Sequence, residues 1–170
     1  MAIVKTDLKQ VPKEWKEFLS LSGKPKWILE VGTFRGKGTT GLCRIAKNVI
    51  TIDIDDRRID RPKNSIFIKA NSQKPHTFDL VKSKLSNNKL DVLFIDADHS
   101  YEGVKRDFEL YKPLVKDGGI IGLHDIVDSA YHRRKDCYVF KFWNEIKEAY
   151  KYKEIIYDGN WAGIGVIWNI

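Results

Sequence analysis

The chain has 170 residues, of which 42% are hydrophobic and 12% aromatic, enough apolar material for one packed domain and too much for a disordered chain. No apolar run is long enough to span a bilayer, and the first residues, Met1 to Asp7, lack the apolar block of a secretion signal. The two cysteines, Cys43 and Cys137, show neither metal-site spacing nor a disulfide pattern. We therefore expect a single domain over residues 1–170 in the reducing cytoplasm, with no membrane partner.

The net charge of +7 favours anionic or phosphate-bearing partners by long-range attraction. The lysines are spread along the whole chain, however, as in many proteins without such a partner. Charge alone therefore leaves nucleic-acid binding open and does not predict it.

The first predicted element is a helix that begins at Pro12, because proline suits the first helical turn, and that ends near Gly23. Short, almost continuous apolar runs rich in β-branched residues then predict strands that are covered on both faces. These runs are Trp27–Val31, Val49–Ile54, Ile66–Lys69, Val92–Ile95 and Gly119–Leu123.

Three segments between or after these runs show apolar residues at helical spacing. Thr77 is placed to cap the first helix and Asp98 to cap the second. The apolar stripes are Phe78, Val81 and Leu85; Val104, Phe108, Tyr111 and Val115; and Val139, Phe142, Trp143, Ile146 and Tyr150.

The end of the chain predicts an antiparallel hairpin, in which Glu154–Tyr157 and Ile164–Trp168 flank a turn rich in glycine and asparagine. Only residues 55–65 join the second strand to the third, and Pro62 interrupts them, so we expect no full crossover helix there. Alternating strands and helices of this kind indicate an α/β fold with a mostly parallel sheet.

A glycine-containing turn, Glu30-Val-Gly32-Thr-Phe-Arg-Gly36-Lys-Gly38, follows the first strand and opens a helix. Glycines allow the backbone to turn sharply and to approach a ligand, and the helix start offers unpaired N–H groups. The turn lacks both the G-x-G-x-x-G spacing of dinucleotide enzymes and the Gly-Lys-Ser/Thr ending of a P-loop. Glu30 would repel a pyrophosphate but could hold a cationic amine, so either an amine-bearing ligand or packing alone explains the turn.

Two carboxylates, Asp53 and Asp55, close the second strand about twenty residues after the turn. A carboxylate at this place can accept hydrogen bonds from both ribose hydroxyls of a nucleoside. We expect Asp53 to bind the ribose, with Asp55 as the alternative. If no ligand binds, the two residues simply form a solvated acidic turn.

Together these blocks resemble class I S-adenosylmethionine (SAM)-dependent methyltransferases. The matching segments are Leu29–Thr39, Ile52-Asp53, Leu93–Asp107 and Leu114–Asp125. The most similar subgroup is that of small-molecule O-methyltransferases, including macrocin O-methyltransferase-like and cephalosporin hydroxylase-like proteins. The resemblance implies a doubly wound, Rossmann-like α/β fold with an N-terminal helix and a seven-stranded sheet in the order 3-2-1-4-5-7-6, the last strand antiparallel.

The resemblance also implies how SAM would be bound. The methionine part would lie against the glycine turn, the ribose against Asp53, and the adenine near the end of the third strand. The implied cofactor-binding residues are Glu30, Gly32, Thr33, Gly36, Asp53, Asn71, Ser72 and Asp96.

Acidic and imidazole side chains end the fourth and fifth strands, namely Asp96, His99, His124 and Asp125. Because the carboxyl ends of neighbouring parallel strands face one crevice, these groups are expected to converge. Methyl transfer from a sulfonium needs a positioned, deprotonated nucleophile. His99, with Asp96, is the predicted catalytic group, since a histidine can accept the acceptor's proton.

A divalent cation such as Mg²⁺ is a possible second cofactor, since two carboxylates suit a hard ion. The resemblance places its ligands at Asp96, His124 and Asp125, where metal-binding members often carry a carboxylate in place of His124. Because imidazole does not favour Mg²⁺, His124 leaves open whether a metal ion is bound.

Residues 131–135, Tyr-His-Arg-Arg-Lys, lie at the same predicted rim. They could receive an anionic or sugar-like methyl acceptor, or form a solvated basic loop. O-methylation of a small hydroxylated molecule is the predicted function. The alternative is a nucleoside- or nucleic-acid-binding protein on the same fold without turnover; an NAD-type dehydrogenase is disfavoured by Glu30 and the missing dinucleotide motif.

Overall fold

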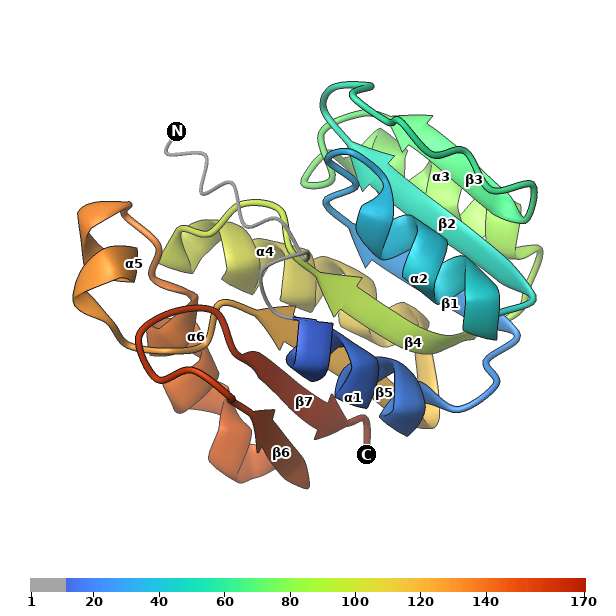
Figure 1. The fold of residues 1–170 in the computed structure, drawn as a ribbon. Helices are drawn as coiled ribbons and strands as arrows, with labels where there is room; N and C mark the ends of the chain where they lie inside the picture. Colours follow the sequence, from blue (N-terminus) through green and yellow to red (C-terminus); the bar gives the residue numbers. More distant parts are fainter. Residues whose placement is uncertain (1–11) are drawn as a thin grey trace.

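The computed structural model describes residues 12–170, which form a seven-stranded sheet with helices on both faces (Figure 1). The strand order is β3-β2-β1-β4-β5-β7-β6, and β7 alone runs antiparallel to its neighbours. This confirms the predicted order and the antiparallel strand. The strands are β1 Trp27–Val31, β2 Asn48–Asp53, β3 Ser65–Lys69, β4 Leu90–Ile95, β5 Val115–His124, β6 Tyr152–Ile155 and β7 Ile164–Trp168.

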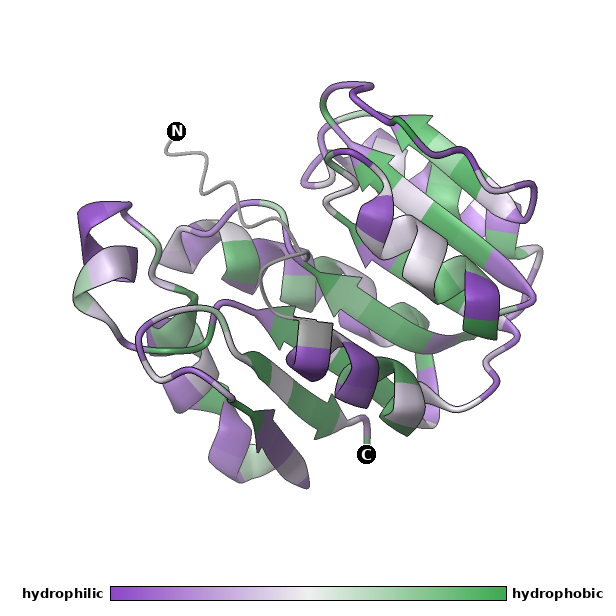
Figure 2. Cartoon of the chain, viewed as in Figure 1, coloured by the Kyte–Doolittle hydropathy of each residue, from purple (hydrophilic) through white to green (hydrophobic). Residues whose placement is uncertain are grey.

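Two groups of helices cover the two faces of the sheet. The helices are α1 Pro12–Ser22, α2 Lys37–Ile45, α3 Pro75–Leu85, α4 Tyr101–Tyr111, α5 Ala130–Arg134 and α6 Val139–Ile146. Residues of α1 and α2 share one apolar cluster with the sheet, and residues of α3, α4 and α6 share the other. Along β1, Ile28 belongs to the first cluster and Leu29 to the second, so this strand is apolar on both sides. Figure 2 shows the central strands mostly in the hydrophobic colour.

Helix α1 packs against the middle of the sheet and also holds the turn between β6 and β7. The rings of Trp15 and Phe18 each lie 5.0 Å from the ring of Phe94 on β4, centroid to centroid. The buried carboxylate of Glu14 accepts backbone N–H groups from Tyr157, at 2.9 Å, and Gly163, at 3.2 Å. Both hydrogen bonds hold the turn between β6 and β7 against α1, so this buried charge is satisfied.

Two predicted helix caps are wrong. Helix α3 begins at Pro75, whose fixed φ suits the first turn, so Thr77 lies inside the helix and its hydroxyl donates to the carbonyl of Asn71 at 2.8 Å. Helix α4 is capped by Ser100, which accepts the N–H of Gly103 at 3.0 Å. Asp98, two residues before the cap, accepts the N–H of Ser100 at 3.0 Å and so helps to position the capping residue.

Several predicted boundaries also shift. Val115, predicted on a helix, is the first residue of β5, because Pro113 cannot continue an α-helix. Tyr150 lies beyond α6, after a 3₁₀ turn over Lys147–Ala149, and β6 begins at Tyr152 rather than Glu154. Residues 54–64 contain no helix, as predicted.

Within residues 12–170, no helix combines the length and apolar character that crossing a bilayer requires. The segment Met1 to Asp7, in which no secretion signal was found, lies outside the described residues.

Candidate active site

The glycine turn joins β1 to α2 and requires glycine for a packing reason. Gly32 has φ +102°, and a Cβ on it would lie 2.0 Å from the carbonyl oxygen of Asp96. Gly36 has φ +82°, and its Cβ would lie 2.9 Å from the carbonyl of Asp60. The turn is therefore pressed against the end of β4 on one side and against the loop after β2 on the other.

Asp53 ties the glycine turn to the end of β2. Its Oδ2 accepts the N–H groups of Thr33, at 3.1 Å, and Phe34, at 2.8 Å, while Oδ1 accepts the N–H of Asp55 at 3.1 Å. Because a carboxylate oxygen can accept two hydrogen bonds, Oδ1 keeps capacity for one more donor. Asp55 is exposed and pairs with Arg57 at 2.9 Å, so of the two acidic residues only Asp53 contacts the turn.

Glu30 is buried beneath the turn. The hydroxyls of Thr39, at 2.5 Å, and Thr51, at 2.6 Å, both donate to its Oε2, and the hydroxyls of Thr51 and Thr33 are also 2.6 Å apart. Burial raises the pKa of Glu30 to about 8, against the opposing effect of the two threonine hydroxyls. Glu30 is therefore linked through the Thr51 hydroxyl to Thr33, which the family resemblance predicted at the cofactor.

The loop that replaces the second crossover helix is fastened to the same turn. The N–H of Ile59 donates to the carbonyl of Arg35 at 3.0 Å, and the Arg58 guanidinium lies 3.7 Å from the ring centroid of Phe67 on β3. Residues 54–64 thus cover the outer side of the glycine turn without forming a helix.

Asn71 and Ser72, which follow β3, are engaged within the protein. Asn71 is exposed and its Oδ1 accepts the N–H of Gln73 at 2.9 Å. The Ser72 hydroxyl donates to Asp107 on α4 at 2.7 Å, and the Tyr111 hydroxyl donates to the Ser72 carbonyl at 2.7 Å. Burial raises the pKa of Asp107 to about 7. Sequence reasoning missed Asp107, although a carboxylate within the apolar stripe of Val104, Phe108 and Tyr111 was a usable signal.

Asp96, His99, His124 and Asp125 converge where β4 and β5 end, as predicted, and one ligand atom from each lies within 4.8 Å of the others. His99 Nε2 lies 3.0 Å from Asp96 Oδ1 and 3.1 Å from Asp125 Oδ2. His124 Nδ1 lies 3.1 Å from the same Asp96 oxygen and 3.4 Å from Asp125 Oδ1. The remaining ring nitrogens, His99 Nδ1 and His124 Nε2, are buried and have no hydrogen-bond partner in the described part of the chain.

The two carboxylates dominate the electrostatics of this cluster. Burial disfavours the charged form of His99, but hydrogen bonds and charge from Asp125 and Asp96 outweigh it and raise the pKa to about 10. Burial acts in the same way on His124, where the two carboxylates raise the pKa to about 9. Burial would raise the pKa of Asp96 and Asp125, yet the neighbouring histidines lower both. Without a bound cation, the cluster therefore holds protonated imidazoles between ionised carboxylates.

A family model described as a methyltransferase domain matches residues 29–126, more than half of the chain. The chain belongs to this methyltransferase-domain family. The match begins in β1 and ends directly after Asp125, so it spans the glycine turn, Asp53 and the whole Asp96–Asp125 cluster. Residues 29–126 therefore form a methyltransferase domain.

Solved structures with the same fold include the N-methyltransferase NodS from Bradyrhizobium japonicum WM9 in complex with S-adenosyl-L-homocysteine (SAH), at TM-score 0.73 and 14% identity, covering 95% of this chain and 86% of that one. An O-methyltransferase from Bacillus cereus in complex with SAH has TM-score 0.69 and 15% identity, covering 99% and 84%. The methyltransferase MycE from the mycinamycin biosynthetic pathway, in complex with Mg, SAH and mycinamycin VI, has TM-score 0.63 and 15% identity, covering 93% and 49%. At these identities the likeness shows the class I methyltransferase fold.

A curated relative, an uncharacterized protein of Acanthamoeba polyphaga mimivirus, is 32% identical over 114 residues. The match covers 59% of this chain and 51% of the relative, so the chain spans about half the length of the curated relative it matches.

His132, one of the residues 131–135 predicted to receive the acceptor, lies in the protein interior instead. His132 is fully buried, its Nδ1 lies 2.6 Å from the carbonyl of Val127, and its Nε2 accepts the N–H of Ala162 at 3.2 Å. Because both nitrogens are occupied inside the protein, the prediction that His132 faces an acceptor is wrong.

The other rim residues do lie at the surface of the methyltransferase. Arg133 pairs with Asp128 through two hydrogen bonds of 2.8 and 2.6 Å, and Tyr131 packs edge-on against Trp161 with centroids 6.3 Å apart. Arg134 and Lys135 are exposed and have no ion-pair partner among residues 12–170.

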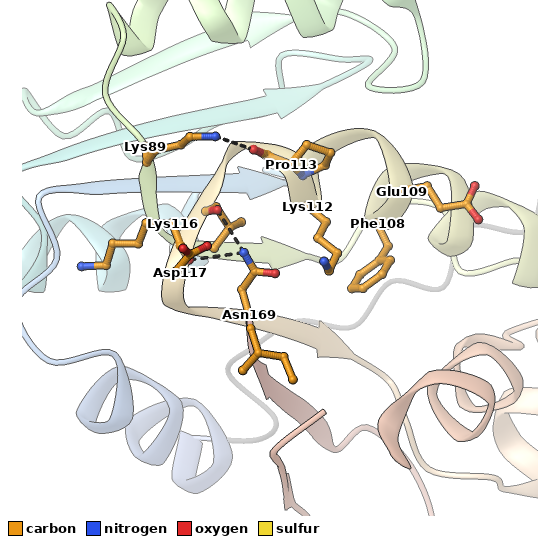
Figure 3. Close-up of a pocket in the computed structure, with 10 residues that line it drawn as sticks. Lys89, Phe108, Glu109, Lys112, Pro113, Lys116, Asp117 and Asn169 are labelled. Atoms are coloured by element: carbon orange, nitrogen blue, oxygen red, sulfur yellow. Dashed lines mark hydrogen bonds between the residues drawn. The ribbon is translucent and has the colours of Figure 1, made fainter. Parts of the chain in front are cut away.

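A cavity of about 750 Å³ lies at the opposite edge of the sheet, where β4 and β5 begin (Figure 3). In it, the amide of Asn169 donates to the carbonyls of Val115 at 3.0 Å and Lys116 at 3.3 Å, and Lys89 donates to the carbonyl of Pro113 (Figure 3). Because the cluster of Asp96, His99, His124 and Asp125 lies where these strands end, this cavity is separate from the candidate active site.

Proposed function

We propose that this methyltransferase transfers the methyl group of SAM to a hydroxyl oxygen of a small molecule, within one domain over residues 1–170. The observation that carries the proposal is the position of His99 between two carboxylates at the ends of β4 and β5, next to the glycine turn. Displacement at a sulfonium methyl group needs an aligned oxygen with a lone pair and a group that accepts its proton.

The cofactor would lie against the glycine turn. Gly32 and Gly36 present bare backbone there, and Oδ1 of Asp53 can still accept one ribose hydroxyl. Glu30 supports the turn from below, through the hydroxyls of Thr39 and Thr51. A cationic amine above the turn would favour the ionised form of Glu30 and so lower its pKa.

His99 is the proposed proton acceptor. Its Nε2–H would donate to Asp96 and Asp125, which leaves the buried, unpartnered Nδ1 to receive the proton of the acceptor hydroxyl. The carboxylates then stabilise the imidazolium that forms, as the aspartate does in a Ser-His-Asp triad. As long as no cation neutralises the two carboxylates, the pKa of about 10 keeps His99 protonated near neutral pH.

The donor set next to His99 suits a divalent cation. Asp96, Asp125 and His124 Nδ1 offer three ligand atoms, with His124 Nδ1 lying 3.1 and 3.4 Å from the carboxylate oxygens. Ligand atoms arranged tetrahedrally about one ion at its usual bond lengths lie roughly 3.3 Å apart, so little rearrangement is needed. When bound, a cation would neutralise the carboxylates and bring the pKa of His99 down towards the range of a useful base.

A small hydroxylated acceptor with an anionic or sugar-like character is supported by the rim. Arg134 and Lys135 supply exposed positive charge, and Tyr131 supplies an exposed aromatic ring, on the segment that follows β5. The likeness in fold to MycE, whose complex holds Mg, SAH and mycinamycin VI, is consistent with this acceptor class.

The test is a transfer assay with SAM labelled in its methyl group, offered matched acceptors that carry a hydroxyl or an amine at the same position. Catechol-like, glycoside and hydroxy-acid scaffolds cover the proposed classes. We expect label on oxygen for at least one hydroxylated scaffold and none on its amine counterpart. Label found only on nitrogen would overturn the O-methyltransferase assignment.

A further inference from the structure

We propose that the site formed by Asp96, His124 and Asp125 binds a transition-metal ion such as Zn²⁺, Fe²⁺ or Co²⁺ in preference to Mg²⁺. This inference deepens the proposed function and depends on the metal site described there. It concerns which ion the chain selects, and the donors at the end of β5 decide it.

The donor chemistry fits Mg²⁺ poorly. Mg²⁺ requires close to ideal octahedral coordination by oxygen and keeps several of its water molecules. Here only Asp96 and Asp125 supply oxygen, while His124 places its Nδ1 where a third ligand would be. Imidazole nitrogen is a ligand that zinc, iron, cobalt and related ions accept readily and that Mg²⁺ does not.

The burial of the site acts in the same direction. The side chains of His124 and Asp125 are fully buried, and that of Asp96 is 12% exposed. The ring of Phe94 lies beside that of His124, with centroids 6.3 Å apart. An ion at this place must give up most of its water, which Mg²⁺ does reluctantly. A four-coordinate ion needs only three protein ligands and one open coordination position. The exposed side of Asp96 is where that open position would lie.

His124 is fixed in its ligating position by the fold. It is the last residue of β5, pairs in register with Ile164 of the antiparallel β7, and is followed directly by Asp125. The strand pair therefore fixes the backbone position from which the buried His124 ring reaches the two carboxylates. His99 comes from the loop after β4 and holds both carboxylates through Nε2, so it orients the ligands and remains the proton acceptor.

The distinguishing experiment measures ion affinity of the metal-stripped full chain by calorimetry with Zn²⁺, Mn²⁺, Co²⁺ and Mg²⁺, and follows Co²⁺ by its visible absorption. We expect Zn²⁺ and Co²⁺ to bind at least about 100-fold more tightly than Mg²⁺, with a Co²⁺ spectrum of mixed nitrogen and oxygen coordination. His124→Asp should reduce that preference at least about tenfold, because it replaces the nitrogen donor by oxygen. His99→Asn should retain the preference of the wild type.

Equal affinity for Mg²⁺ and Zn²⁺, or a preference that is unchanged in His124→Asp, would overturn the inference. So would the absence of ion binding at millimolar concentration in a protein that still binds SAM and methylates a hydroxyl. In that last case the O-methyltransferase proposal stands and only the metal site fails. Tight Zn²⁺ or Co²⁺ binding with label transferred only to nitrogen would instead support the metal site and overturn the O-methyltransferase proposal.

Discussion

Asp53 illustrates how one side chain can serve the fold and the proposed cofactor site together. Two of its acceptor positions hold the backbone of the glycine turn, and a third accepts the N–H of Asp55. Only Oδ1 keeps capacity for a further donor, so the expected contact to ribose is a single charge-assisted hydrogen bond rather than a pair of hydrogen bonds, one to each oxygen.

Asp53→Asn is therefore expected to weaken SAM binding by about tenfold to a hundredfold, because the amide keeps the shape but loses the charge and one acceptor. Calorimetry with SAM measures the change, and a thermal melt checks that the turn still folds. The matched control is Asp55→Asn, which changes an exposed residue paired with Arg57 and should leave SAM affinity unaltered. Equal losses in the two variants would contradict the assignment of the ribose contact to Asp53.

At the scale of elements, the approach of β1 to β4 sets the shape of the site. A side chain at Gly32 would have to occupy the space of the Asp96 carbonyl, and the same peptide region carries the Asp96 side chain into the cluster. The glycine turn and the carboxylate cluster are therefore one rigid unit, and disturbing one should displace the other.

Gly32→Ala is expected to destabilise the fold by roughly 3 kcal/mol or more, since it adds both a clash and an unfavourable positive φ. Gly118→Ala separates these effects, because Gly118 also has positive φ, +71°, but its Cβ would meet nothing within 4 Å. That control should lose only about 1–2 kcal/mol. Urea unfolding compares the two, and similar losses would show that close approach at Gly32 contributes little.

At the scale of the whole molecule, stability should depend on pH through buried groups. The folded-state pKa of Glu30 is raised to about 8, so in the folded protein the carboxyl stays protonated over a range where the unfolded chain has already lost the proton. Stability from this group is present below pH 4.5 and is lost as pH rises to 8. His99 and His124, raised to about 10 and 9, contribute stability that is present below pH 6.5 and lost above it.

Glu30→Gln should therefore flatten the fall in stability between pH 5 and 7, removing a slope of up to about 1.4 kcal/mol per pH unit. Urea midpoints measured with a chelator present, so that no cation occupies the cluster, give the slope directly. Glu109→Gln on the exposed side of α4 is the control and should leave the slope as in the wild type. An unchanged slope in Glu30→Gln would mean that Glu30 ionises normally in the folded chain.

Much of this fold was predictable from the sequence, because buried parallel strands leave apolar runs and their carboxyl ends meet at one edge. That geometry is why Asp96, His99, His124 and Asp125 could be grouped without a structure. The missed features depend on contacts between distant segments. His132 is buried because the backbone of Ala162, thirty residues later, reaches its ring, and Ser72, in the turn before α3, is held by Asp107 on α4.

The local errors have a different cause. At α4, Asp98 and Ser100 are both capping residues by type, and it is the Ser100 hydroxyl that reaches the free N–H of Gly103. At α3, the helix already begins at Pro75, so Thr77 lies inside it. Choosing a cap from residue type alone cannot resolve such neighbours, because the chain path before the helix determines which hydroxyl reaches a free N–H.

The most direct measurement of the central claim is the turnover of His99→Asn, together with its SAM affinity, on whichever hydroxylated acceptor the wild type methylates. Asparagine can hydrogen-bond the carboxylates but cannot take up a proton, so kcat should fall by about 10²–10⁴-fold while the Kd for SAM changes little. His76→Asn, an exposed histidine on α3, should behave as the wild type. Full turnover in His99→Asn with unchanged SAM binding would contradict the account.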